Sequence, residues 1–120
     1  QRPRWREAVR LVAQRRAPDD LVLSLPSTVT EFYLTGGRET DVRRPDSVVH
    51  LDRYQARVYE TWAQEGRRMW FVLRTDYLNT FRSEDRARLR RFLGEECRLV
   101  ERFPVLVEGR DLSIEVWRFP

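Results

Sequence analysis

Hydrophobic residues change their spacing several times along the chain, and each change predicts an element. Between residues 4 and 16 they recur at steps of three and four, which predicts an amphipathic helix with one apolar stripe. The stripe consists of Trp5, Ala8, Val9, Val12 and Ala13. A polar turn then leads into the continuous apolar run 21–25, which is typical of a strand that is covered on both faces. A helix followed by a buried strand favours an α/β layered fold.

The next stretch is more polar. Thr28 and Glu31 have the spacing of a capping box, so we expect a short helix through residues 32–34 that ends at Gly36. Residues 38–47 show no hydrophobic period and predict a loop. Residues 48–51 then predict a short strand.

Asp52 is expected to cap a further helix, whose inner face would carry Tyr54, Val58 and Trp62. The five apolar residues 69–73 predict the strongest strand of the chain. An aromatic loop over residues 76–82 should follow it.

The last third predicts a helix and then two strands. The helix opens at Ser83 and packs through apolar residues on one side, namely Ala87, Leu89, Phe92 and Leu93. After Cys97 the period shortens, which indicates two strands joined by a tight hairpin over residues 108–111. Together these elements predict a three-layer, Rossmann-like α/β sandwich. Its sheet would be mostly parallel, with about five strands and a C-terminal antiparallel hairpin at the edge.

Length and composition narrow the function classes. The 120 residues suit a single α/β domain, expected to be soluble, and no apolar run approaches the roughly 20 residues of a membrane span. All 23 basic residues are arginine, against 19 acidic residues, for a net charge of +4. Because the arginines alternate with acids and no nucleic-acid-binding motif accompanies them, we expect no nucleic-acid partner. The residual charge suits solubility, or contact with an anionic membrane surface or a phosphate-bearing ligand.

The chain offers little catalytic chemistry. No glycine-rich phosphate loop follows the first strand, so no nucleotide cofactor is expected. A single cysteine and a single histidine exclude a disulfide within the chain, a cysteine-based zinc site and a multi-histidine metal site. We therefore predict no catalytic, cofactor-binding or metal-binding residue. Ligands of open α/β sheets bind at the carboxyl ends of the strands, so ligand or acceptor contact is predicted at four residues there. These are Ser27, Thr28, Thr75 and Asp76.

The ordered motifs resemble the carboxy-terminal region of bacterial GT-C membrane glycosyltransferases. The relevant proteins are those similar to dolichyl-phosphate-mannose protein mannosyltransferases and to the aminoarabinose transferases of lipid A. The resemblance covers nearly the whole chain. Its anchors are Trp5-Arg6, Asp20 before the first strand, Phe32-Tyr33-Leu34, the run 68–72 and the closing hairpin 103–119.

This resemblance implies a domain on the periplasmic or extracellular side of the cell membrane, cut from a larger membrane protein. Its partners would be the transmembrane portion of the same polypeptide and a lipid-linked sugar or acceptor, and contact with the membrane surface is also expected. The parent would transfer a sugar from a polyprenyl-phosphate donor, whereas this domain would be a non-catalytic accessory. Two alternatives stay open: a free-standing, small Rossmann-like transferase, or a protein-interaction module.

Overall fold

The computed structural model describes residues 4–26, 30 and 48–120. Its helices are α1 (Trp5–Arg15), α3 (Val58–Gln64), the 3-10 helix η1 (Thr75–Thr80) and α4 (Ser83–Glu96). Its strands are β1 (Leu21–Leu25), β2 (Val49–His50), β3 (Met69–Arg74), β4 (Arg98–Phe103), β5 (Leu106–Val107), β6 (Arg110–Asp111) and β7 (Ile114–Phe119).

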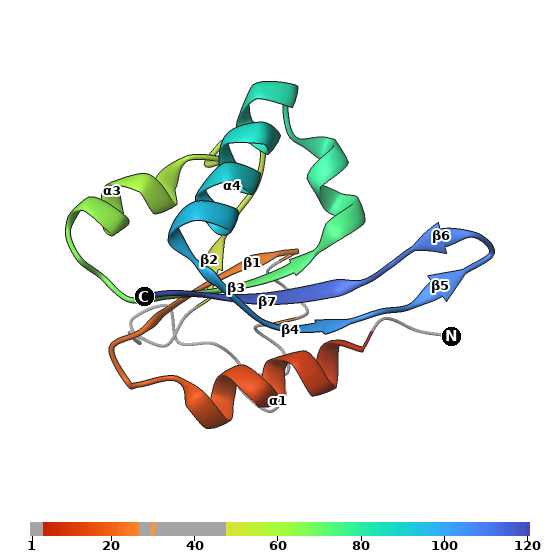
Figure 1. The fold of residues 1–120 in the computed structure, drawn as a ribbon, viewed down its shortest axis with the longest axis horizontal. Coiled ribbons are helices and arrows are strands. Elements are labelled where there is room, and N and C mark those ends of the chain that lie inside the picture. The colour runs from red at the N-terminus through yellow and green to blue at the C-terminus, as the bar shows by residue number, and fades with distance from the viewer. Residues whose placement is uncertain (1–3, 27–29, 31–47) are drawn as a thin grey trace.

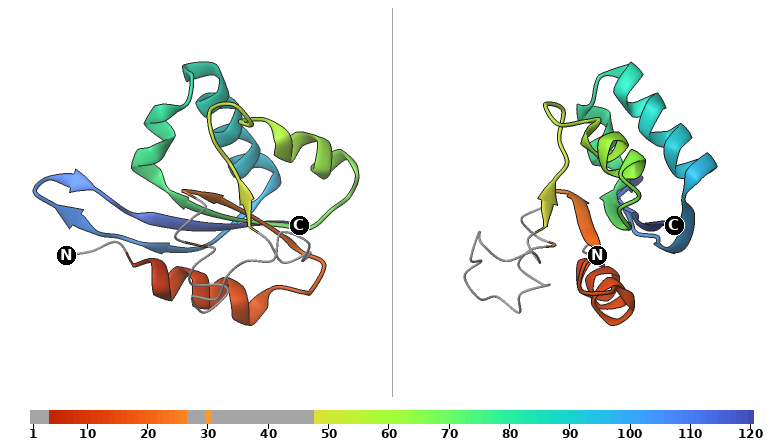
Figure 2. Two further views of the ribbon diagram at one scale, coloured as in Figure 1. Left: turned by 180° about the vertical axis from the view of Figure 1, so that it is seen from behind. Right: turned by 90° about the vertical axis from the view of Figure 1, so that its left-hand side faces the viewer.

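One sheet separates the helices into two layers. Its five strands run in the order β2-β1-β3-β7-β4, and β5 pairs with β6 in a separate ribbon at the tip of the closing hairpin. Helix α1 covers one face of the sheet, while α3 and α4 lie over the other (Figure 1). The view turned by 90° shows α1 on the opposite side of the strands from α4 (Figure 2).

The alternation of side chains along the central strands explains why their sequences are continuously apolar. Val22 of β1 and both Trp70 and Val72 of β3 pack with α1 through the helix residues Trp5 and Val12. The residues between them face the other way. Each central strand therefore buries both of its faces, as the apolar runs predicted.

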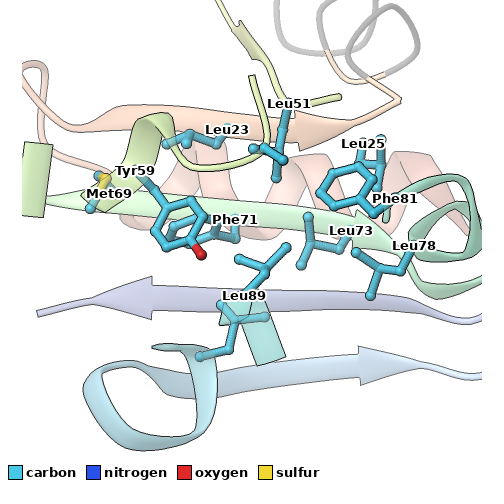
Figure 3. Close-up of a cluster of buried hydrophobic side chains, with 12 residues drawn as sticks. Leu23, Leu25, Leu51, Tyr59, Met69, Phe71, Leu73, Leu78, Phe81 and Leu89 are labelled. Atoms are coloured by element: carbon cyan, nitrogen blue, oxygen red, sulfur yellow. The ribbon is translucent and has the colours of Figure 1, made fainter. Parts of the chain in front are cut away.

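The face opposite α1 carries the larger aromatic core. Leu23 from β1 and Phe71 from β3 meet Tyr59 of α3 and Leu89 of α4, and all four side chains are completely buried (Figure 3). The rings of Tyr59 and Phe71 meet edge to face, with their centroids 6.0 Å apart. This aromatic contact fixes α3 against the sheet.

The prediction of a mostly parallel, Rossmann-like sheet is wrong. Strand β1 pairs in parallel with β2 and β3, whereas β7 pairs antiparallel with both β3 and β4. Among the four longer strands, only the pair β1–β3 is parallel. The reason is the connection: no helix separates β4 from β7, so the chain turns back in a hairpin and β7 lies antiparallel beside β3.

Three helix predictions also need correction. The helix expected after Asp52 begins at Val58, and Tyr54, assigned to its inner face, is 79% exposed. The Asp52 carboxylate instead accepts hydrogen bonds from the amides of Tyr54 and Gln55 and closes a turn. Ala13 of α1 and Ala87 of α4, both predicted to pack, are exposed. The loop expected over residues 76–82 mostly forms η1, and the capped helix expected over residues 28–37 lies outside the described residues, Thr30 excepted.

Candidate functional site

The carboxyl ends of the parallel strands meet at one edge of the sheet. Leu25 at the end of β1 lies opposite Leu73 of β3, and Ser24 lies opposite His50 of β2. The segments that follow these strands therefore begin side by side. This edge is where an α/β sheet places its ligands.

A groove of about 470 Å³ opens beside the end of β3. One wall is formed by the start of η1, with Thr75, Asp76 and Asn79, and the other by Arg110 and Asp111 of β6. Figure 1 shows η1 and the β5–β6 ribbon on the same side of the molecule. The groove offers a hydroxyl, an amide, two carboxylates and a guanidinium, so hydrogen-bond donors and acceptors face a common hollow. Its size lies within the range of small-molecule sites.

Thr75 is held in place by the start of β7. Its amide and its hydroxyl both donate to the carbonyl oxygen of Ser113, at 3.0 and 3.4 Å. Ser113 is buried, and its amide and hydroxyl both donate to the Asp111 carboxylate. The two walls of the groove are thus joined through Ser113, which fixes their separation.

Both carboxylates of the groove have fixed basic partners. Arg74 holds Asp76 in a bidentate pair with distances of 2.8 and 3.0 Å, and its guanidinium also stacks over the Tyr77 ring. Asp111 pairs with Arg102 at 3.1 Å. The hydrogen bonds from Ser113, then the charge of Arg102, lower the pKa of Asp111 below its ordinary value. The Asp111 carboxylate is therefore suited to accept hydrogen bonds rather than to deliver a proton.

A second groove, of about 300 Å³, is lined by residues of the turn before α3 and by the start of α4. Arg53 stacks over the exposed Tyr54 ring and donates a hydrogen bond of 2.6 Å to its hydroxyl. Arg57 pairs with Asp85 at 2.8 Å, and Arg82 completes the basic lining. This groove combines aromatic and cationic surface with two acids, of which Asp85 is paired with Arg57.

A further hollow, of about 540 Å³, lies between α3 and α4. Phe92 and Phe119 line it, with ring centroids 5.2 Å apart. Around them stand charged side chains, among them the paired Glu60 and Arg88. The hydrogen bond from Arg88 outweighs burial and lowers the pKa of Glu60. This hollow was not anticipated, because it depends on how the two helices pack.

The predicted site residues divide into two groups. Thr75 and Asp76 line the groove beside β3, hereafter the strand-end groove, whereas Ser27 and Thr28 lie outside the described residues. Asn79, Arg110 and Asp111 were missed. Asn79 lies in the segment that was expected to be an aromatic loop. The only signal for Arg110 and Asp111 was the polar turn of the closing hairpin, and nothing in the sequence brings that turn against η1.

Asp20 and Cys97 lie outside these grooves. Asp20, at the opposite end of β1, is buried in ion-pair contact with Arg68, with an N–O distance of 3.0 Å. Burial raises the pKa of the Cys97 thiol to about 12, with a further contribution from Glu96. Within residues 4–26, 30 and 48–120, no group of three or more histidine, cysteine, aspartate or glutamate side chains could hold a metal ion.

No helix in the described part of the chain is both long and apolar enough to cross a membrane. Searches with protein-family models, curated proteins and solved structures find no match to this chain.

Proposed function

We propose that this chain is the extracytoplasmic accessory domain of a polyprenyl-phosphate-sugar-dependent membrane glycosyltransferase. It would not be catalytic by itself. The strand-end groove would contact the acceptor or the lipid-linked sugar, while the transmembrane portion of the same polypeptide performs the transfer.

The observation that carries this proposal is that both carboxylates of the strand-end groove are paired with arginines. Asp76 and Asp111 each have a fixed arginine partner, so they are suited to accept hydrogen bonds from hydroxyl groups. Asn79 is exposed beside them and supplies both donors and an acceptor. A hydroxyl-rich ligand such as a sugar matches this set.

The anchors of the sequence resemblance give a second line of support. Asp20 accepts a hydrogen bond of 3.0 Å from the Trp70 indole and pairs with Arg68, and Trp5 packs in the same cluster as Trp70. Residues far apart in the sequence thus meet around one turn. Motifs that hold a fold together, and leave catalysis to another part of the polypeptide, are what an accessory domain requires.

The parent polypeptide can be tested in native cells. An antibody raised against this chain should detect a membrane-embedded polypeptide much larger than 14.5 kDa. Protease added outside the cytoplasmic membrane of spheroplasts should remove the epitope. A free polypeptide of this size in the cytoplasmic fraction would refute the proposal.

The groove can be tested with the isolated chain. Incubation with polyprenyl-phosphate-linked sugars and acceptor should give no transfer, whereas saturation-transfer NMR should detect weak sugar binding. Asn79→Ala with Arg110→Ala should abolish that signal, and Arg91→Ala, outside the groove, should not. Sugar transfer by the isolated chain would contradict the accessory role.

A further inference from the structure

The net charge of the chain is concentrated in one helix together with the residues that flank it. Residues 4–16, which span α1 and its two flanking arginines, contain five arginines and one glutamate, a net charge of +4, of which α1 itself contributes +2. The other 107 residues contain 18 arginines and 18 acidic residues. This one segment therefore accounts for the whole net charge of the molecule.

The fold exposes this local excess of positive charge on one surface of α1. Trp5, Ala8 and Val12 point into the core, while Arg6, Arg10 and other polar side chains of α1 are exposed. Arg6 and Arg10 are one helical turn apart, so their side chains lie on the same side of the helix. Helix α1 covers the face of the sheet opposite α3 and α4 (Figure 2). We call its exposed surface, which carries Arg4, Arg6, Arg10 and Arg15, the basic face.

Helix α4, on the other side of the sheet, shows a different arrangement. It contains four arginines and four acidic residues, so its net charge is zero. Two of its arginines have acidic partners on other elements: Arg88 pairs with Glu60, and Arg90 pairs with Glu115 at 2.8 Å. The one glutamate of α1, Glu7, lies 3.7 Å from Arg4, and both side chains are about half exposed. The two helices thus differ in net charge, which is zero for α4 and positive for α1.

We propose that the basic face of α1 docks on a bilayer surface rich in anionic phospholipid. Guanidinium groups bind phosphate oxygens with bidentate hydrogen bonds, and each arginine near an anionic leaflet adds to the attraction. Because the apolar stripe of α1 is buried under the sheet, the helix rests on the headgroups without inserting into the bilayer. The contact is electrostatic and is weakened by salt.

This inference goes beyond the proposed function and can fail separately from it. Docking needs only α1 and an anionic surface, so the isolated chain suffices to test it. Sugar binding in the strand-end groove concerns other elements. Either result can be obtained without the other.

The experiment is vesicle flotation with the purified chain. Vesicles of phosphatidylcholine containing about one third phosphatidylglycerol should bind the chain at low salt, whereas pure phosphatidylcholine vesicles should not. Raising the salt to about 0.5 M should release it. Arg10→Gln with Arg15→Gln should weaken binding about 25-fold, or about fivefold for each arginine. Glutamine is a good helix former, and circular dichroism with the melting temperature verifies the fold.

The matched control is Arg86→Gln with Arg91→Gln, which removes two charges from α4. It should weaken binding by less than about twofold, because α4 lies on the side of the sheet opposite α1 and salt weakens the attraction of charges that are far from the bilayer (Figure 2). Equal losses in both double variants, equal binding to neutral vesicles, or binding that salt does not reduce would each overturn the proposal. Preference for duplex DNA or RNA over the vesicles, through Arg10 and Arg15, would also overturn it.

Discussion

Asp20 shows how one buried carboxylate can organise a turn. One of its oxygens accepts hydrogen bonds from the Ala17 amide, at 2.9 Å, and from the Trp70 indole, at 3.0 Å. Burial alone would raise its pKa. The hydrogen bonds from Ala17 and Trp70, with the charges of Arg68 and Arg118, outweigh burial and hold the pKa below its ordinary value of 3.8. The ionised form therefore stabilises the connection between α1 and β1.

Asp20→Asn should lower the free energy of unfolding at pH 7 by about 1–2 kcal/mol, since the amide keeps the shape of the side chain but loses the charge-assisted bonds. Stability from a carboxyl with a lowered pKa is present above the unfolded pKa and disappears as the pH falls through the folded pKa. Urea titrations should therefore show the two proteins converging below about pH 4. Asp19→Asn, at the exposed neighbour, is the control and should change little. A constant difference across this pH range would contradict the assignment.

The pKa of Cys97 is shifted in the opposite direction to that of Asp20. Burial, then the charge of Glu96, raises the pKa of its thiol from 9.0 to about 12. At pH 9 the folded chain should be alkylated by iodoacetamide at least about tenfold more slowly than the chain unfolded in urea, because the thiolate is the reactive species. The raised pKa also means that stability decreases as the pH rises from 9 towards 12, and Cys97→Ala should remove that part of the decrease. Equal alkylation rates would show that the thiol is accessible and ionised.

At the scale of elements, the turn between β5 and β6 depends on its backbone conformation. Val107 pairs with Arg110, so the loop consists of two residues, Glu108 and Gly109, with φ angles of 50° and 76°. Positive φ at both positions defines the tight hairpin turn that favours asparagine followed by glycine. Glycine fills the second position, but glutamate stands at the first.

Replacement of glycine by alanine should therefore have opposite effects on stability at two positions. Gly109→Ala should destabilise the protein by about 1 kcal/mol. The new methyl group has open space around it, but an alanine is strained at the positive φ angle of this position. Gly94→Ala in α4 has open space and no positive φ, and should stabilise by about 0.5–1 kcal/mol. Glu108→Asn should gain a few tenths of a kcal/mol. Urea midpoints measure all three, and a loss of stability at Gly94 would refute the argument.

Elements whose pattern is local could be predicted, and the order of the strands in the sheet could not. The stripe from Trp5 to Val12 and the run 69–73 predicted α1 and β3, because side-chain periodicity alone specifies them. The position of β7 between β3 and β4 depends on contacts between distant residues, and the sequence contains no local signal for it. Thr75 and Asp76 follow a strand end and were found from that position. Arg110 and Asp111 reach the strand-end groove only through the folded hairpin.

For the whole molecule, the central strands couple the two sides of the core. Neighbouring residues on one strand, such as Phe71 and Val72, belong to opposite clusters. The four tryptophans are divided between these sides: Trp5 and Trp70 pack with the α1 cluster, and Trp62 and Trp117 pack against the other. Loss of one layer would expose strand side chains on that face and weaken the sheet beneath the other layer.

The molecule should therefore unfold as one cooperative unit. Leu89→Ala, in the completely buried cluster under α4, should lower the free energy of unfolding by about 2–5 kcal/mol. In a chain labelled with 5-fluorotryptophan, the native ¹⁹F resonances of all four tryptophans should disappear at one lowered urea midpoint. Earlier loss of the Trp62 and Trp117 signals would show that the α3–α4 layer unfolds alone. A shared midpoint requires that the loss of stability caused by a cavity on one face of the sheet also reaches α1 on the other face, through the central strands.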